Sequence, residues 1–371
     1  MHSRPSKWFR LAVVGTAAAL PLTMLSLEPA QAATTNVSVV GYSVVGPAFT
    51  ALETDFKATP AGQNVTFTNS FGASDTETNN LVKGQSADLV NLSYEPNMAT
   101  LVTYNKIPAN WANQERTIGG VNAALRGKRQ VTVYHTPGIV TDSVVVFIVR
   151  PGNPLGITNW GDLAKSGVQV VTPNPVTSGS ARWNLLAGYS AQISLGRTPN
   201  EGQDYLKALI SNTIAQPVSG SAALAAFVGG TGNVLLDYED DALAAVAAGD
   251  KIQIVTPPQT LLIENPIAVT DLGLTDPAAV AFYKFLFSTA GQTALAGLGY
   301  RSVLKSVWTS TESKFTSFKK PTDLLTVEAL SGWTNLNTEF FSPNVVFPSG
   351  NTTYPTQGIV TYLEKFAGST S

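Results

Sequence analysis

The feature that most constrains the fold is a run of six apolar residues, Val144–Val149, all β-branched except Phe147. A strand that is apolar at every position must be covered on both faces, which is typical of a sheet flanked by helices on either side. Strand-like and helix-like segments alternate along the rest of the chain, and this predicts an α/β fold with parallel or mixed sheets. The expected strands are 36–41, 64–68, 87–92, 143–149, 168–172, 233–236 and 252–256, and the expected helices are 49–56, 76–83, 181–190, 203–209, 239–248 and 277–287.

Two scarce residue types exclude whole classes of site. The sequence has no Cys, and its two His are His2 and His135. Disulfide frameworks, thiolate metal sites, catalytic thiols and multi-His metal sites are therefore excluded, and no cofactor is expected. A Ser-His-Asp triad would have to use His135, and no G-x-S-x-G motif accompanies it. The net charge of −2 also argues against nucleic acid, which needs a basic surface.

The first 32 residues have the layout of a secretory signal peptide. Basic residues precede an apolar run from Leu11 to Leu27, and Ala30-Gln31-Ala32 provides a cleavage site of small residues. A membrane anchor is the alternative, but the run contains Pro21 and has no strong stop-transfer flank. We expect a periplasmic or secreted protein with no lipid-bearing cysteine.

The segment from Val168 to Asn184 predicts an anion site. A buried strand ends at Thr172, and Thr177-Ser178-Gly179-Ser180 then opens a helix. Ser178 is a candidate N-cap, and Gly179 lets a ligand approach the backbone closely. The first-turn amides carry partial positive charge and bind oxyanions without Lys or Arg. Ordinary capping by Ser without a ligand is the alternative.

This segment, TPNPVTSGSARWN at 172–184, resembles the signature of the sulfate/thiosulfate-binding proteins, the substrate-binding components of bacterial ABC importers. In that family the run is TPNP-x-SSGGARWN. Further blocks resemble the family in the same order: FGASD at 71–75, ADLV at 87–90, VFIVRPGNP at 146–154, GNVLLDYEDDA at 232–242, IVTP at 254–257, and residues 283–292 and 332–333. The resemblance covers about residues 37–341, nearly all of the expected mature chain.

The resemblance implies which residues bind the anion. Ser74 aligns with a loop serine that donates its hydroxyl and amide, and Gly220 with a position that donates a backbone N–H. Tyr238 aligns with a tryptophan whose indole N–H reaches the ligand. Ser178, Gly179 and Ser180 align with the S-G-G at the helix start, and Ser43 falls where the family has Asp.

Two departures from the family pattern concern specificity. Asp75 replaces a glycine after Ser74, and Asp237 replaces an alanine beside Tyr238. Sulfate is fully ionised at neutral pH and is repelled by a carboxylate, whereas hydrogen phosphate can donate its proton to one. If either carboxylate faces the ligand, phosphate becomes the better ligand. The alternative is that Asp75 caps the next helix and Asp237 faces solvent.

Other groups of residues give weaker indications of a function. Asp237, Glu239, Asp240 and Asp241 could form a hard-cation site, but the last three more simply complement a helix dipole. Arg182 is expected to hold the loop backbone rather than the anion itself. Residues 112–140 look like a basic insertion relative to the family, either a solvated loop or a partner surface. Residues 341–371 are rich in Pro, Thr, Ser and Gly, which predicts a loosely packed tail.

By resemblance, we expect a two-lobed periplasmic-binding-protein type II fold, each lobe a central mixed sheet flanked by helices. Residues 33–146 and 258–371 would form lobe 1, and 147–257 lobe 2. The expected function is capture of sulfate or thiosulfate between the lobes and delivery, as a monomer, to an ABC permease with its ATPase. Phosphate or molybdate binding is the near alternative. A secreted hydrolase or a surface adhesion or scaffold protein is the more distant one.

Overall fold

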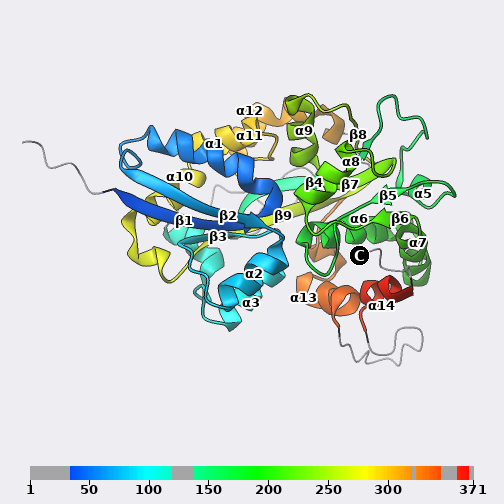
Figure 1. Ribbon diagram of the computed structural model, residues 1–371, viewed down its shortest axis with the longest axis horizontal. Coiled ribbons are helices and arrows are strands. Elements are labelled where there is room, and N and C mark those ends of the chain that lie inside the picture. The colour runs from blue at the N-terminus through cyan, green and yellow to red at the C-terminus, as the bar shows by residue number, and fades with distance from the viewer. Residues whose placement is uncertain (1–33, 119–136, 320–322, 344–356, 367–371) are drawn as a thin grey trace, which may run out of the picture. The chain divides into compact units, whose positions relative to one another are not determined.

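The computed structural model describes residues 34–118, 137–319, 323–343 and 357–366 (Figure 1). The expected signal peptide, His135 and residues 119–136 of the expected insertion lie outside this part of the chain. Its strands form one hydrogen-bonded network in the order β2-β1-β3-β9-β4-β7-β5-β6, with β10 beside β9 and β8 beside β4. The strands are β1 Thr35–Tyr42, β2 Val65–Gly72, β3 Leu89–Asn91, β4 Ile139–Val149, β5 Val170–Val171, β6 Thr213–Ala215, β7 Val234–Tyr238, β8 Gln253–Val255, β9 Gln259–Val269 and β10 Asp323–Leu325.

Helices follow most strands, as the alternation predicted. The α-helices are α1 Gly46–Lys57, α2 Ser74–Val82, α3 Glu95–Thr103, α4 Gln114–Thr117, α5 Trp160–Leu163, α6 Gly179–Ser194, α7 Pro199–Ser211, α8 Gly220–Val228, α9 Glu239–Ala248, α10 Pro277–Leu286, α11 Thr289–Gly297, α12 Lys305–Thr311, α13 Trp333–Leu336 and α14 Ile359–Phe366. The short helical turns used below are η1 Ser43–Val45, η4 Glu312–Lys319 and η6 Asn337–Phe341.

The two longest strands, β4 and β9, connect two groups of strands. The first half of β4 pairs antiparallel with β9, and its second half, Val145–Val149, pairs antiparallel with β7. The far end of β9 pairs with β3, which lies next to β1. The predicted lobe boundaries fall within β4, between residues 146 and 147, and just before β9, between residues 257 and 258, and that division stays a prediction.

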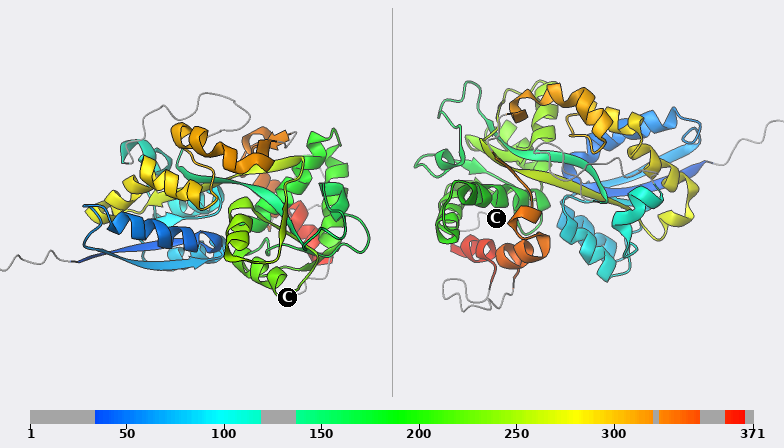
Figure 2. Two further views of the ribbon diagram at one scale, coloured as in Figure 1. Left: turned by 90° about the horizontal axis from the view of Figure 1, so that it is seen from above. Right: turned by 180° about the vertical axis from the view of Figure 1, so that it is seen from behind.

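The apolar run in β4 is buried on both faces, as predicted. Val145, Phe147 and Val149 belong to the core cluster that includes Trp160 and Trp183, beneath α5 and α6. The alternate residues Val144, Val146 and Ile148 belong to a second cluster with Phe227 of α8 and Ala242 of α9. Figure 2 shows helices on both faces of the strands. The α/β prediction is confirmed.

The strands near the N-terminus are covered in the same way. Phe56 of α1 and Phe282 of α10 pack on one face, with their ring centroids 5.2 Å apart and Phe67 of β2 4.7 Å from Phe282. The opposite face packs Val40 and Val90 against the α2–α3 side, where Leu81 and Met98 are buried. The carboxyl ends of β1, β2 and β5 lead directly into segments that the sequence singled out, and β7 ends at Tyr238.

The prediction of a loosely packed tail is wrong for residues 357–366. These residues include α14, in which Ile359 and Val360 are buried and belong to the main core cluster together with Phe340 and Phe341. The apolar side chains of α14 recur at helical spacing, and that periodicity outweighs the Pro- and Ser-rich composition around it.

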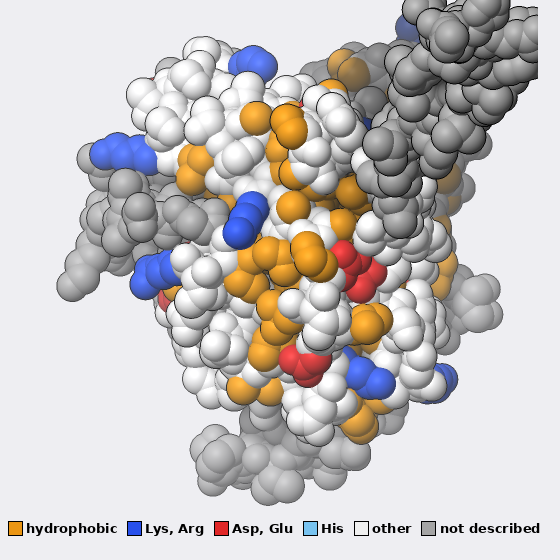
Figure 3. All heavy atoms as spheres, turned by 90° about the vertical axis from the view of Figure 1, so that its left-hand side faces the viewer, with side chains coloured by type: hydrophobic (Ala, Val, Ile, Leu, Met, Phe, Trp, Pro, Cys, Tyr) orange, Lys and Arg blue, Asp and Glu red, His pale blue; other side chains and the backbone are white. Residues whose placement is uncertain are grey.

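The surface and the helix lengths also bear on the function. In the described part of the chain, no helix is long and apolar enough to cross a membrane. Figure 3 shows one face of the molecule, on which Lys and Arg side chains are separated by neutral and apolar atoms.

Candidate anion-binding site

Four helices begin at or directly after residues that the sequence singled out. Helix α2 begins at Ser74, α6 at Gly179, α8 at Gly220 and α9 directly after Tyr238. The first-turn amides of a helix have no acceptor within the helix and carry its partial positive charge. Ser178 is the N-cap residue of α6, as predicted, but its side chain accepts no hydrogen bond from the helix.

Ser74 and Gly179 are joined through Ser93. The Ser74 hydroxyl accepts a hydrogen bond from the Ser93 N–H at 3.0 Å. A Cβ placed on Gly179 would lie 1.9 Å from the Ser93 Oγ and 2.6 Å from the Tyr94 ring. Glycine is therefore required at 179 because the β3–α3 segment occupies the space that a side chain would fill.

Ser180, Gly220 and Ser43 form a second set of contacts. A Cβ placed on Gly220 would lie 3.3 Å from the Ser180 Oγ and 3.8 Å from the Ser43 Oγ. The Ser43 hydroxyl also accepts from the Ser221 N–H at 3.4 Å. These contacts bring the start of α8 beside the start of α6 and the turn that follows β1.

Tyr238 completes this second set. Its hydroxyl lies beside the side chains of Ser180 and Asn265, but it meets neither in a well-aligned hydrogen bond. Burial raises the pKa of the Tyr238 phenol well above its usual range, while Ser180 favours the ionised form. The phenol is therefore neutral and can donate its proton to a bound oxyanion.

The predicted binding residues thus lie in one connected, largely buried region. Its hydroxyl and amide groups carry no formal charge, and the side chains of Ser74, Ser178, Ser180 and Tyr238 are at most 3% exposed. Such a set of neutral donors at helix N-termini can bind a fully ionised oxyanion by hydrogen bonds alone.

Asp75 and Arg182 form an ion pair beside this region. The Arg182 guanidinium contacts the Asp75 carboxylate at 2.5 Å and donates from Nε to the Pro175 carbonyl at 3.1 Å. Asp75 also accepts from Asn97 at 2.6 Å and from the Tyr94 hydroxyl at 3.0 Å. Both oxygens of this carboxylate are therefore satisfied by protein donors.

Asp237 is buried rather than solvent-facing, contrary to the alternative that the sequence left open; it is 1% exposed. One carboxyl oxygen accepts from the Tyr238 N–H at 2.8 Å, and the side chain also meets that of Asp241. Burial raises the pKa of Asp237 well above its usual range, and the nearby Asp241 raises it further. The two carboxyl groups can bond to each other only if one of them is protonated.

The acidic stretch after Tyr238 has no metal-site geometry. Within the described ranges, no group of three or more His, Asp or Glu side chains could hold a metal ion. Glu239, Asp240 and Asp241 all lie in the first turn of α9, where acids complement the helix dipole. Glu239 also pairs with Arg301 at 2.6 Å.

Three residues of this region were missed by sequence reasoning. Ser93 lies two residues beyond β3, and Asn265 lies within β9 and donates to the Ser93 carbonyl at 3.0 Å. Tyr42 donates to Asn265 at 3.1 Å, and its ring lies 6.2 Å from that of Tyr238. The usable signal for Ser93 was its place just after the carboxyl end of a strand, where α/β proteins bind ligands.

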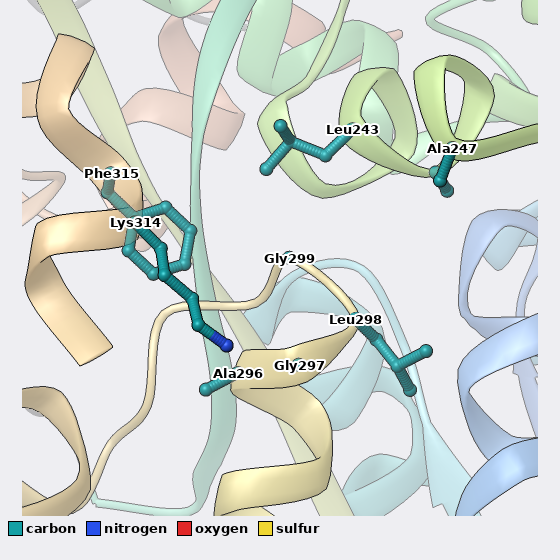
Figure 4. Close-up of a pocket in the computed structure, with 9 residues that line it drawn as sticks. Leu243, Ala247, Ala296, Gly297, Leu298, Gly299, Lys314 and Phe315 are labelled. Carbon is teal, nitrogen blue, oxygen red and sulfur yellow. The ribbon is translucent and has the colours of Figure 1, made fainter. Parts of the chain in front are cut away.

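A separate pocket of about 420 Å³ lies between α9, the end of α11 and η4 (Figure 4). Leu243, Leu298 and Phe315 are among its lining residues, and Lys314 is the only charged one. None of the predicted site residues lines it. Its apolar walls do not suit a small, strongly hydrated oxyanion.

Comparison with known proteins identifies relatives along most of the chain. The family described as bacterial extracellular solute-binding protein matches residues 37–301. The sulfate-binding protein of Synechococcus elongatus is 31% identical over 313 residues, which cover 82% of this chain and 83% of that protein. The thiosulfate-binding protein of Pseudomonas aeruginosa is 28% identical, with 63% of this chain and 68% of that protein covered.

A solved structure agrees with these relatives. The sulfate-binding protein SubI from Mycobacterium tuberculosis is 37% identical and superposes with a TM-score of 0.74. The match covers 83% of this chain and all of that one. The fold is therefore shared over the whole length of the solved protein.

Proposed function

Because the chain belongs to the family of bacterial extracellular solute-binding proteins, we propose that it binds sulfate or thiosulfate outside the cytoplasm and delivers it to an ABC importer. Segment 1–32 would direct its export and then be cleaved. The mature protein would act as a monomer. Its partners would be a membrane permease and the ATPase that drives it. It would perform no chemistry on the ligand and need no cofactor.

One observation carries this proposal: neutral hydroxyl and amide donors at the starts of α2, α6 and α8 converge in one buried region. Sulfate carries two charges and no proton at neutral pH, so it requires donors and no acceptor. Helix N-termini supply such donors without a neutralising Lys or Arg.

The placement of Asp75 supports sulfate over phosphate. The Asp75 carboxylate is satisfied by Arg182, Asn97 and Tyr94, and Asp237 is engaged by the Tyr238 N–H and by Asp241. Because both Asp75 oxygens already accept hydrogen bonds from the protein, the proton of hydrogen phosphate finds no free acceptor at Asp75. Phosphate or molybdate remains the alternative ligand.

We further propose that the two predicted lobes close on the anion. Ser43 and Ser74 belong to lobe 1, whereas Ser178, Gly179, Ser180, Gly220 and Tyr238 belong to lobe 2. The Ser43–Ser221 and Ser93–Gly179 contacts would then form only on closure. A bound anion completes its hydrogen bonds only in the closed form, which favours a hinge motion.

Titration calorimetry with sulfate, thiosulfate, phosphate and molybdate tests the proposal. We expect sulfate or thiosulfate to bind and phosphate to bind far more weakly. Ser178→Ala should weaken sulfate binding by about 1–3 kcal/mol, because a donor is lost from a desolvated site. Absence of binding to all four anions would favour the scaffold alternative. A pH-dependent preference for phosphate would mean that Asp75 or Asp237 faces the ligand.

A further inference from the structure

The Ser93 side chain has no evident structural role. It is 1% exposed, and its Oγ has no hydrogen-bond partner among the described residues. A buried hydroxyl that has lost water without gaining a partner costs about 1–3 kcal/mol, so such groups are rare in native proteins. The described part of the folded chain therefore supplies no partner for this hydroxyl, and a partner would have to come from outside it.

The Ser93 backbone, in contrast, is fixed from three sides. Its N–H donates to the Ser74 hydroxyl at 3.0 Å. Its carbonyl accepts from the Trp183 indole at 2.7 Å and from the Asn265 amide at 3.0 Å. The partners belong to α2, α6 and β9. They hold the Ser93 backbone in place, so that only the side-chain hydroxyl can still rotate.

The Ser93 hydroxyl lies against the first residue of α6. Its Oγ would be 1.9 Å from a Cβ on Gly179, so it occupies the place where residue 179 would carry a side chain. It is therefore next to the first-turn amides of α6, which carry the partial positive charge of a 16-residue helix. A hydroxyl at that place can turn its proton toward the same anion that the amides bind.

We propose that the Ser93 hydroxyl is a further donor to the bound tetrahedral oxyanion, beside the first-turn amides of α6. The inference rests on the proposed function and deepens it, because neither the sequence motifs nor the resemblance assigned a role to Ser93. A bound oxygen atom supplies the acceptor that the protein lacks. The apolar alternative at this position, alanine, would leave the anion with one donor fewer.

Calorimetry with sulfate and thiosulfate on Ser93→Ala tests the inference. We expect affinity to fall roughly tenfold to a hundredfold, as for loss of a hydrogen bond to a charged group. The matched control is Ser190→Ala, because the Ser190 hydroxyl is equally buried but donates to the Ala187 carbonyl at 3.0 Å within α6. This control should bind with wild-type affinity.

Urea unfolding without ligand separates binding from structure. If the Ser93 hydroxyl binds the ligand, Ser93→Ala should be as stable as the wild type or more stable without ligand, since the substitution removes an unsatisfied buried group. Ser93→Cys, whose thiol is slightly larger and a weaker donor, should bind with intermediate affinity and decides the question if Ser93→Ala does not fold.

The outcomes distinguish the two proposals. Wild-type protein that binds neither anion would overturn the proposed function and this inference with it. Wild-type binding with unchanged affinity in Ser93→Ala would overturn the role of Ser93 alone. A loss of affinity matched by a loss of ligand-free stability in both Ser93 variants would make Ser93 structural and also overturn the inference.

Discussion

At the scale of single residues, the contribution of the Tyr238 hydroxyl to sulfate binding can be measured separately from that of its ring. The ring is fully buried, and the hydroxyl has no well-aligned partner. Tyr238→Phe should weaken sulfate binding by about 1–3 kcal/mol and leave ligand-free stability unchanged, because only a ligand donor is lost. Calorimetry and urea unfolding measure the two effects. Equal sulfate affinity in Tyr238→Phe would remove this hydroxyl from the site.

The matched control for that variant is Tyr205→Phe. The Tyr205 hydroxyl donates to the Trp160 carbonyl at 2.9 Å, so its loss leaves a buried acceptor unsatisfied. We expect the opposite pattern, with stability lowered by about 1–2 kcal/mol and sulfate affinity unchanged.

Arg182 connects α6, the helix proposed to bind the anion, to other parts of the molecule. It contacts Asp75 on α2, the Pro175 carbonyl and Asn337 of η6. Arg182→Ala leaves the Asp75 carboxylate without its cation and should lower the free energy of unfolding by about 2–3 kcal/mol, since the pair is only 13–16% exposed. Urea denaturation measures this change. Arg197→Ala, which breaks the exposed pair with Glu201, should leave unfolding unchanged, and an equal effect of both variants would contradict the argument.

At the scale of elements, the start of α6 is expected to tolerate no side chain. In Gly179→Ala the new Cβ would meet the Ser93 Oγ at 1.9 Å and Tyr94 at 2.6 Å, so α6 and the β3–α3 segment must move apart. We expect at least a tenfold loss of sulfate affinity and a lower melting temperature. The control is Gly297→Ala in α11, where a Cβ meets nothing within 4 Å. That variant should gain about 0.5–1 kcal/mol of stability, and a Gly179→Ala protein that behaves like it would refute the close packing.

The elements that could be predicted are those whose pattern is local. Strand β4 carries an unbroken apolar run, and α9 follows its strand with acids in the first turn. Strand β9 was missed because Glu264, Asn265 and Pro266 interrupt its apolar residues, although all of its residues are buried. Asn265 and the Pro266 carbonyl have partners far away in sequence: Asn265 bonds to Tyr42 and Ser93, and the Pro266 carbonyl accepts from Asn91. Tertiary pairing of this kind leaves no periodic signal.

The same limit applies to the site. The first-turn amides of α6 were predictable from a strand, a Ser-Gly-Ser sequence and a helix. Ser93 was not, because its role depends on the absence of a side chain at Gly179, 86 positions further along the chain. A short polar residue after a strand is common, and only the packed structure shows that its hydroxyl lacks a partner.

At the scale of the whole molecule, the buried acids at the start of α9 should make the stability of the fold depend on pH. Burial raises the pKa of Asp240 to about 7 and that of Asp241 to about 6, and it also raises the pKa of Asp237. The groups that interact with Asp240 are Tyr42 of β1, Ser143 of β4, Asp237 and Tyr238 of β7, Asp241 of α9, and Tyr300 and Arg301. Of these, Arg301 is the cation, and it is already paired with Glu239.

The sign of the effect follows from proton binding. Between about pH 4 and pH 7 the unfolded chain has released these protons while the folded chain still holds them, so the free energy of unfolding should fall as pH rises through this range. Asp240→Asn keeps a neutral side chain at every pH and should flatten the decline, with stability near wild type at pH 4 and above it at pH 8. Urea midpoints across this range measure the slope, with Asp204→Asn on the exposed face of α7 as control. A wild-type stability that rises steadily from pH 4 to pH 8, or an Asp240→Asn slope equal to that of the wild type, would show that Asp240 is ionised in the folded protein.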